Sequence, residues 1–314
     1  MKILIAGGSG YIGRRLSTSL VNDGHVVVIL TRGQPRAFPP PLAAEGQGGD
    51  LRYVAWDARS ASGDWVSELS GAQAVVNLAG ASVGSWPWTR GRMAQLLSSR
   101  LDATSAIVQA IEGTPADRRP STLLNASGID YYGDRGDETI TEESQPGDSF
   151  LARMSQQWET AALKAEPLGV RVVRMRTSMV FGRGAPAFNL LTLPVRLFVG
   201  GPYGNGRQWF TWIHVDDIVG LYRFALEDGR LSGAVNAVAP DIRPQVEVAK
   251  EIGRVLHRPA WFPAPSPLLR LALGAESQLL LDGRRAVAEK AKAAGYQFRF
   301  GGLPQALEEA LRSR

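Results

Sequence analysis

Three glycines near the start of the chain constrain its fold more than any other feature. Gly7, Gly10 and Gly13 stand between an apolar run typical of a strand (2–7) and a periodic run typical of a helix (11–22). The first glycine allows a tight turn, the second lets backbone approach a diphosphate, and the third lets helix pack on strand. The N–H groups that open such a helix bind phosphate. The pattern predicts dinucleotide binding, with a glycine-rich turn that holds no ligand as the alternative.

The end of the second predicted strand indicates which dinucleotide binds. An NAD site is expected to carry an acid here, which accepts a hydrogen bond from the ribose 2′-hydroxyl. The strand, residues 25–32, ends instead in Thr31 and Arg32, and the nearest acids are Asp23 and Glu45. A guanidinium suits a 2′-phosphate. We therefore predict NADP(H) in preference to NAD(H), with an exposed strand-end charge as the alternative for Arg32.

Short β-branched runs alternate with helical patterns through the first half of the chain. The predicted strands cover residues 2–7, 25–32, 52–57, 74–80, 121–127 and 170–176. The predicted helices between them cover residues 11–22, 89–112 and 149–166. Several strands are apolar on both faces, as strands covered by helices on both sides must be. The predicted fold class is α/β, a Rossmann-like doubly wound parallel sheet with a smaller C-terminal mixed α/β substrate domain.

The pattern loosens after about residue 180, which suggests a division of the chain. We expect a Rossmann domain that binds NADP over residues 1–180, with strand and helix contributions from about 205–240. Residues 181–314 would form a substrate-binding and C-terminal extension region. Asp216 or Asp217 is expected to start a helix, because either makes a good N-cap. Further helices are predicted at 244–256, 284–294 and 303–313, and the Pro- and Gly-rich stretch 33–49 is predicted to be a surface loop.

The composition limits the kinds of partner that we expect the chain to bind. The chain has no cysteine and three histidines, so no metal site is expected. Its net charge is +5, but the basic residues are scattered among acids, which argues against nucleic acid and fits an anionic cofactor or substrate. No apolar run is long enough for a membrane span or a signal-peptide core. We expect a cytoplasmic monomer or homodimer that binds a small-molecule substrate, with neither nucleic acid nor a membrane as partner.

Later motifs give the chain a family resemblance. After the glycine turn come VNLAGA, SSRLDAT, YYGDRGDE, DSFLARMSQQWE, GRQWFTWIHVDD and GAVNAVAP. In this order they resemble the extended short-chain dehydrogenases/reductases, in an atypical branch of epimerase-family oxidoreductases with a characteristic C-terminal extension. The resemblance places Arg100 where many extended members have a cofactor-contacting Asn. Together with the turn and Arg32, it implies the cofactor-binding residues Gly7, Ser9, Gly10, Tyr11, Ile12, Gly13, Thr31, Arg32, Asp57, Leu78, Ala79, Gly80, Arg100 and Arg176.

The stretch FLARMSQQWETAA departs from this family pattern. In relatives a tyrosine exchanges the substrate proton, and a lysine four residues later lowers the pKa of the tyrosine and binds the ribose. Their places here fall on Leu151 and Ser155, and Glu159 keeps the helix register recognisable. Lys164 lies nine residues beyond Ser155, about 14 Å along a helix. The usual proton relay is therefore absent.

Other residues are candidates for the missing chemistry. The resemblance matches Ser127 to the active-site Ser/Thr, and Tyr131 and Tyr132 follow it closely. These three are the predicted catalytic residues, with wall packing and cofactor contact as the alternative for the tyrosines. Further candidates for proton transfer or charge are Arg135, Glu142 and Glu143, and the predicted substrate-binding residues are Arg153, Arg207 and Trp209. His214 is expected to brace a helix start, with an adjacent acid as its partner, and not to catalyse.

Two functions fit these observations. The first is an NADP(H)-dependent oxidoreductase or epimerase-like enzyme acting on a small polar or anionic substrate without the Tyr-x-x-x-Lys dyad. Its proton would come from Tyr131, Tyr132, a nearby carboxyl group or water. The second is an NADP(H)-binding regulatory or interaction protein with little or no catalysis, because some relatives are linked to bacterial or plastid division.

Overall fold

A parallel sheet forms the centre of the molecule. The computed structural model describes residues 1–32 and 49–311. The strands run in the order β11-β7-β5-β4-β1-β2-β3, and every neighbouring pair is parallel. Their bounds are β1 Lys2–Ala6, β2 Val26–Thr31, β3 Leu51–Ala55, β4 Ala74–Asn77, β5 Thr122–Gly128, β7 Arg171–Thr177 and β11 Gly233–Ala237. The order reverses beside β1, which is the topological switch point where such sheets bind ligands.

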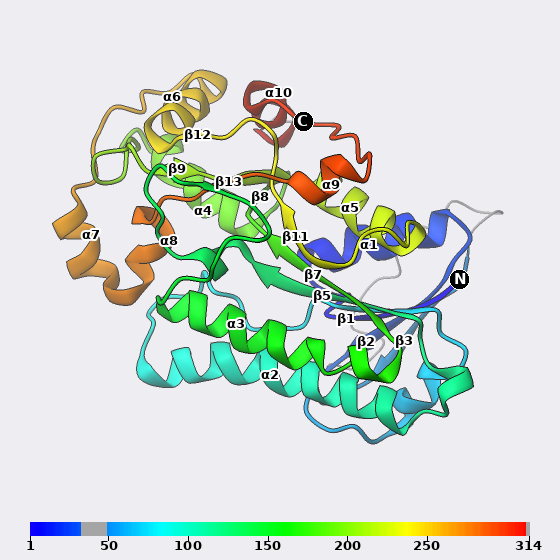
Figure 1. Cartoon of the computed structure of the whole chain (residues 1–314). Coiled ribbons are helices and arrows are strands. Elements are labelled where there is room, and N and C mark those ends of the chain that lie inside the picture. The colour runs from blue at the N-terminus through cyan, green and yellow to red at the C-terminus, as the bar shows by residue number, and fades with distance from the viewer. Residues whose placement is uncertain (33–48, 312–314) are drawn as a thin grey trace.

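Helices cover both faces of this sheet (Figure 1). On one face, α1 (Tyr11–Asn22) and α5 (Val215–Glu227) bury Leu16, Leu20 and Leu221 against the strands. On the other, α2 (Arg90–Gly113) and α3 (Phe150–Leu163) pack side by side. This confirms the predicted Rossmann-like fold. The sheet is doubly wound because its strands are apolar on both faces.

A smaller region packs on the edge of the sheet near β7 and β11. Its helices are α4 Pro186–Arg196, α6 Gln245–Leu256, α7 Ser266–Leu273, α8 Gln278–Leu281, α9 Glu289–Ala293 and α10 Leu303–Leu311. Its short strands are β8 Met179–Phe181, β9 Trp209–Phe210, β10 Trp212–His214, β12 Arg243–Pro244 and β13 Arg285–Ala286, the last paired with β6 Thr139–Ile140. Phe181, Phe188 and Trp212 form the centre of its separate core. This region provides the predicted mixed α/β part.

Short 3-10 helices complete the connections between the larger elements. They are η2 Asp64–Leu69, η3 Ala116–Arg118, η4 Ile129–Tyr132, η5 Glu166–Leu168 and η6 Gly274–Ser277. The one that matters most for the site is η4, because it follows β5 directly and sets the direction of the side chains after Ser127.

Two predicted helix positions are wrong. The predicted helix at 284–294 is instead the short strand β13 followed by α9, because the backbone there pairs with β6 and the Val287 N–H donates to the carbonyl of Ile140 at 2.9 Å. The helix predicted to start at Asp216 or Asp217 begins at Val215, with His214 as its N-cap. The predicted loop at 33–49 lies almost wholly outside the described residues. The predicted domain boundary near residue 180 stays a prediction.

Candidate active site

The glycine turn joins β1 to α1 with no room for side chains. Gly7 has a φ of 77°, a backbone conformation that favours glycine. A Cβ on Gly7 would lie 2.7 Å from the carbonyl carbon of Leu78, and one on Gly13 would lie 2.4 Å from the Gly7 carbonyl oxygen. The Gly10 N–H closes the turn on that same oxygen at 3.0 Å. The turn therefore brings bare backbone to the switch point of the sheet.

Two cavities meet at this turn. A smaller one of about 290 Å³ lies over the ends of β2 and β3, and a larger one of about 440 Å³ extends over the ends of β4 and β5. Both are lined by Gly7, Gly10 and Leu78. Together they make one elongated site with the glycine turn at its middle, the arrangement that a dinucleotide needs.

Most of the predicted cofactor-binding residues lie on the walls of these two cavities. Those that do are Gly7, Ser9, Gly10, Tyr11, Ile12, Gly13, Thr31, Arg32, Asp57, Leu78, Ala79, Gly80 and Arg100. Arg176 does not line either cavity, because its guanidinium lies beneath the floor of the larger one and is 2% exposed. A direct cofactor contact from Arg176 is therefore not supported.

The smaller cavity has a second arginine that the sequence reasoning missed. Arg59 lines it together with Arg32, and both side chains are exposed. Asp57 shapes the loop between them, since its Oδ1 accepts from the N–H groups of Arg59 and Ser60 at 2.8 and 2.9 Å. These bonds hold the pKa of the Asp57 carboxyl below its usual value. Arg32, after β2, and Arg59, in the loop after β3, thus present two guanidinium groups to this cavity.

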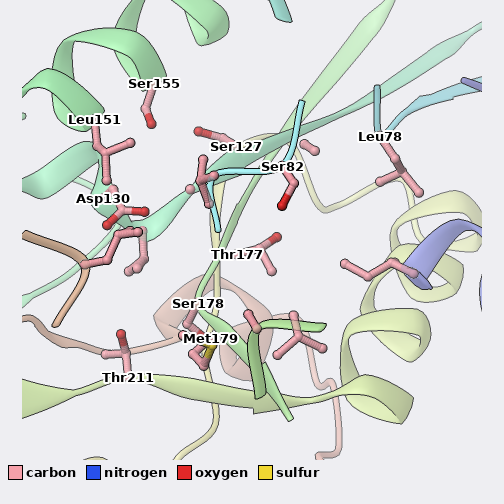
Figure 2. A pocket seen from close by; sticks show the side chains of 18 of the residues that line it. Leu78, Ser82, Ser127, Asp130, Leu151, Ser155, Thr177, Ser178, Met179 and Thr211 are labelled. Carbon is pink, nitrogen blue, oxygen red and sulfur yellow. The ribbon is translucent and has the colours of Figure 1, made fainter. Parts of the chain in front are cut away.

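Ser127 lies at the carboxyl end of β5 and lines the larger cavity (Figure 2). Its hydroxyl donates to Oε1 of Glu159 at 2.7 Å, from α3. Glu159 is 2% exposed and forms ion pairs with Arg176 at 2.8 Å and Arg174 at 2.9 Å. Because Glu159 takes the only proton of the serine hydroxyl, Ser127 presents its oxygen to the cavity as a hydrogen-bond acceptor.

The two tyrosines predicted to catalyse do not line the larger cavity. Tyr132 is fully buried, donates to Oδ1 of Asn236 at 2.8 Å and accepts from Arg176 at 2.7 Å. Burial raises the pKa of Tyr132 to about 12. The ring of Tyr131 stacks on the Arg176 guanidinium at 3.5 Å. The helix η4 directs both tyrosines at Arg176 and not into the larger cavity, so this geometry does not support catalysis by the pair.

The three further candidates for proton transfer or charge also contact other residues. Glu142 is 5% exposed, and its Oε1 accepts from the N–H groups of Asn236 at 3.1 Å and Lys290 at 3.3 Å. Glu143 is exposed and pairs with the Lys290 ammonium at 3.1 Å. Arg135 pairs with Glu138. None of these three candidate side chains lines the larger cavity.

The predicted substrate-binding residues separate in the structure. Arg153 points away from the larger cavity and donates to the Asp148 carbonyl. Arg207 lines a neighbouring cavity of about 320 Å³ together with Arg270. Trp209 lines both this cavity and the larger one, so it alone of the three borders the site.

His214 is buried at the start of α5. Its Nδ1 accepts from the Asp216 N–H at 3.2 Å, and its Nε2 lies 2.7 Å from Glu309 of α10. This is the expected bracing position at a helix start. The carboxylate partner, however, is Glu309 and not an adjacent acid.

Asp130, Asp282 and Arg284 are polar residues of the larger cavity that sequence reasoning missed. The Nη2 atom of Arg284 lies 3.0 Å from Oδ1 of Asp130 and 3.2 Å from Oδ2 of Asp282. Burial raises the pKa of Asp282, against the lowering effect of Arg284. Asp130 and Asp282 are the acids among the described residues that line this cavity. Asp130 could have been suspected from the sequence, because it follows Ser127 by three residues. Asp282 and Arg284 lie in the C-terminal segment, far from Ser127 in the sequence.

One face of α3 forms the wall beside Ser127 and Asp130 (Figure 2). Leu151, Met154, Ser155 and Trp158 line the cavity from this face, and no lysine is among the described residues that line it. A point at the Cβ position of Gly128 would be 3.3 Å from Oδ2 of Asp130 and 3.8 Å from Oγ of Ser155. A carboxyl oxygen and a hydroxyl therefore face each other across the end of β5.

The sheet order, the glycine turn at the switch point and the serine at the end of β5 define an extended short-chain dehydrogenase/reductase. Sequence comparison agrees with this class. The model of the NAD dependent epimerase/dehydratase family matches residues 3–237, and a domain of unknown function, DUF1731, matches residues 264–310. The chain belongs to this epimerase family and carries the DUF1731 segment as the C-terminal extension that the resemblance predicts.

Named relatives span nearly the full chain. Epimerase family protein YfhF of Bacillus subtilis is 35% identical over 100% of this chain and 99% of its own length. The chloroplastic SDR39U1 homolog of Arabidopsis thaliana is 33% identical over 99% of this chain and 87% of its own length. The human epimerase family protein SDR39U1, whose structure was solved with NADPH, superposes with a TM-score of 0.85 at 32% identity, covering 99% of each chain.

Two further observations bear on the predicted partners. Among residues 1–32 and 49–311, no group of three or more His, Asp or Glu side chains is arranged to hold a metal ion. Over the same ranges, none of the helices has the length and apolar character needed to cross a membrane.

Proposed function

We propose that this protein is an NADP(H)-dependent oxidoreductase or epimerase-like enzyme that acts on a small polar or anionic substrate. The observation that carries the proposal is the larger cavity, which continues from the glycine turn to Ser127, Asp130 and Arg284. A protein that only senses its cofactor would not need a chamber of about 440 Å³ that extends beyond the turn to these polar side chains.

The chain's residues fit NADP(H). Gly10 is the glycine at which backbone can approach a diphosphate, and side chains at Gly7 and Gly13 would collide with Leu78 and with the Gly7 carbonyl and so disrupt the turn. Arg32 and Arg59 at the far end suit a 2′-phosphate, since a guanidinium binds phosphate through paired hydrogen bonds. The NADPH in the human relative's structure supports the same preference.

Asp130 is the group we assign to proton transfer. When bound, NADPH would supply a hydride to a substrate carbonyl carbon, and Asp130 would give a proton to the carbonyl oxygen. Arg284 anchors Oδ1 of Asp130, which leaves Oδ2 on the side of Gly128 and Ser155. In the reverse direction the same oxygen takes the proton of a substrate hydroxyl. Ser127 would accept a hydrogen bond from another donor group of the substrate, because the serine oxygen is turned to the cavity as an acceptor.

NADPH consumption in the presence of a panel of aldehydes, ketones and keto acids tests this function. We expect turnover by the wild type and a loss of at least about tenfold in Ser127→Ala, because the substrate loses the hydrogen-bond acceptor that positions one of its donor groups. Tight NADPH binding without turnover on any compound of the panel would contradict the proposal. That outcome would favour the second candidate, an NADP(H)-binding regulatory or interaction protein.

A further inference from the structure

The most unusual charge in the larger cavity is the guanidinium of Arg100. This residue lies on α2 and is 8% exposed. Its Nη1 donates to the carbonyl of Leu96 at 2.8 Å, and its Nε has no hydrogen-bond partner. Within the part of the chain that the structure describes, no carboxylate forms an ion pair with it. Asp130 is the acid whose charge raises the pKa of Arg100, but its carboxylate is paired with Arg284.

A buried and unpaired cation is unfavourable for the empty protein. Buried charges are ordinarily paired, since an uncompensated one loses its hydration without replacement. Burial lowers the pKa of Arg100 to about 10, which still leaves the group charged at neutral pH. The fold thus maintains a positive charge here that its own carboxylates do not neutralise.

The surroundings of Arg100 direct this charge at the cavity. Its Cζ lies 5.0 Å from the ring centre of Trp158, on the α3 wall of the cavity. On the other side, a Cβ at Gly80 would come within 3.3 Å of Cζ, so glycine makes room for the guanidinium. Gly80 follows Leu78 and Ala79, on which the glycine turn packs. Arg100 is therefore held between α3 and the turn, where a ligand in the cavity must pass.

We propose that Arg100 is the anion receptor of the larger cavity and binds a phosphate or carboxylate oxygen of the ligand. Two sources have this chemistry: the diphosphate of the dinucleotide, which rests on the proposed function, and an acid group on the substrate. Either would pair with the guanidinium and satisfy its unused donors. The cavity then has two cations, Arg100 from α2 and Arg284, of which Arg284 is already paired with Asp130 and Asp282.

The test compares wild type with Arg100→Met, Arg100→Lys and Arg90→Met. Arg90 is an exposed arginine at the start of the same helix, so its replacement controls for loss of one positive charge. The first measurement is the Kd for NADPH, with adenosine 2′-monophosphate as a ligand that lacks the diphosphate. The second is the Kd for inorganic phosphate and for malonate on NADPH-loaded protein. Thermal unfolding of each unliganded variant accompanies both.

If Arg100 binds the diphosphate of the cofactor, Arg100→Met should weaken NADPH binding at least about tenfold, as expected for the loss of a charge-assisted hydrogen bond. The Kd for adenosine 2′-monophosphate should stay unchanged. If Arg100 binds an acid group of the substrate instead, Arg100→Met should leave NADPH binding unchanged and weaken the binding of phosphate or malonate at least about tenfold. Arg100→Lys should lose less ligand affinity than Arg100→Met, and Arg90→Met should bind each ligand with wild-type affinity. The unliganded Arg100→Met protein should unfold at the wild-type temperature or above it.

Two results would overturn the proposal. One is wild-type affinity of Arg100→Met for NADPH, phosphate and malonate alike. The other is a lowered unfolding temperature together with equal weakening of every ligand, adenosine 2′-monophosphate included, which would make Arg100 a structural residue. Failure of the wild type itself to bind NADPH would refute the proposed function separately, and phosphate and malonate titrations of the unliganded protein would then still decide the role of Arg100.

Discussion

The hydroxyl of Ser127 and the carboxylate of Glu159 are joined by a hydrogen bond of 2.7 Å. Glu159 lies about one helical turn beyond Ser155 on α3, and in the sequence it served only to fix the helix register. In the structure it neutralises Arg174 and Arg176 and sets the direction of the Ser127 hydroxyl. The floor of the site is therefore an ion-pair network, and its members act on the cavity through Ser127.

Glu159→Gln should destabilise the protein by about 3 kcal/mol, because removing one member of a buried ion pair leaves the partner charges uncompensated. Urea-induced unfolding followed by circular dichroism measures this loss. Ser127→Ala is the matched control, since it removes one hydrogen bond of the same carboxylate and should cost about 1 kcal/mol. Equal and small effects of both substitutions would contradict the central role of Glu159.

Tyr132→Phe should leave turnover within about twofold of wild type, although this tyrosine follows Ser127 closely in sequence. Its phenol bonds Asn236 and Arg176 away from the cavity, and its raised pKa of about 12 makes it a poor proton carrier at pH 7. Stability should fall by about 1 kcal/mol through the lost hydrogen bonds. Steady-state NADPH oxidation and urea unfolding measure the two quantities. A drop in kcat of tenfold or more at unchanged stability would restore Tyr132 as a catalytic candidate.

The parts of the molecule that could be predicted from sequence are those that depend on local patterns. The glycine turn and the strands beside it are set by neighbouring residues, because turn chemistry and hydrophobic period are local. Asp282 and Arg284 could not be found in this way. They reach the cavity through contacts between distant segments, such as the bond from the Gly283 N–H to Oδ1 of Asp134 at 3.0 Å.

The error on Tyr131 and Tyr132 has a different physical origin. Closeness in sequence to Ser127 says nothing about direction when the chain turns into a short helix, and η4 directs these rings at Arg176. Asp130, on the same turn, points the other way and borders the cavity. Side-chain direction on an irregular turn is set by the packing around it, and here that packing comes from β7.

Arg32→Ala and Arg59→Ala should each weaken NADPH about ten- to a hundredfold and change NADH affinity little, because a guanidinium contact with the 2′-phosphate is charge-assisted. Fluorescence titration of both reduced cofactors measures the effect, and Arg90→Met controls for net charge. The double substitution should bring the two affinities close together. Parallel losses of NADPH and NADH would show that these arginines do not read the 2′-phosphate.

Glu142 should make stability depend on pH. Burial raises its pKa above the ordinary value of 4.5, so the fold disfavours the ionised form. This penalty is absent below the unfolded pKa, grows as pH rises through the raised pKa, and is then constant. The Tm of wild type relative to Glu142→Gln should therefore fall between pH 4.5 and pH 7. Glu143→Gln, at the exposed neighbour, controls for the lost charge, and a Tm difference for Glu142→Gln that does not vary with pH would contradict the assignment.

Asp130→Asn tests proton transfer at the site most directly. The amide keeps the shape of the side chain and its contact with Arg284 but cannot exchange a proton, so kcat on a substrate from the carbonyl panel should fall about a hundredfold or more. NADPH affinity should stay within about twofold, because the turn and both arginines of the smaller cavity are untouched. Asp282→Asn should lose less, since Asp282 contacts Asp130 only through their shared arginine. If Asp130→Asn retained kcat within about threefold, the proton would have to come from solvent, and Ser127 would be left to position the substrate alone.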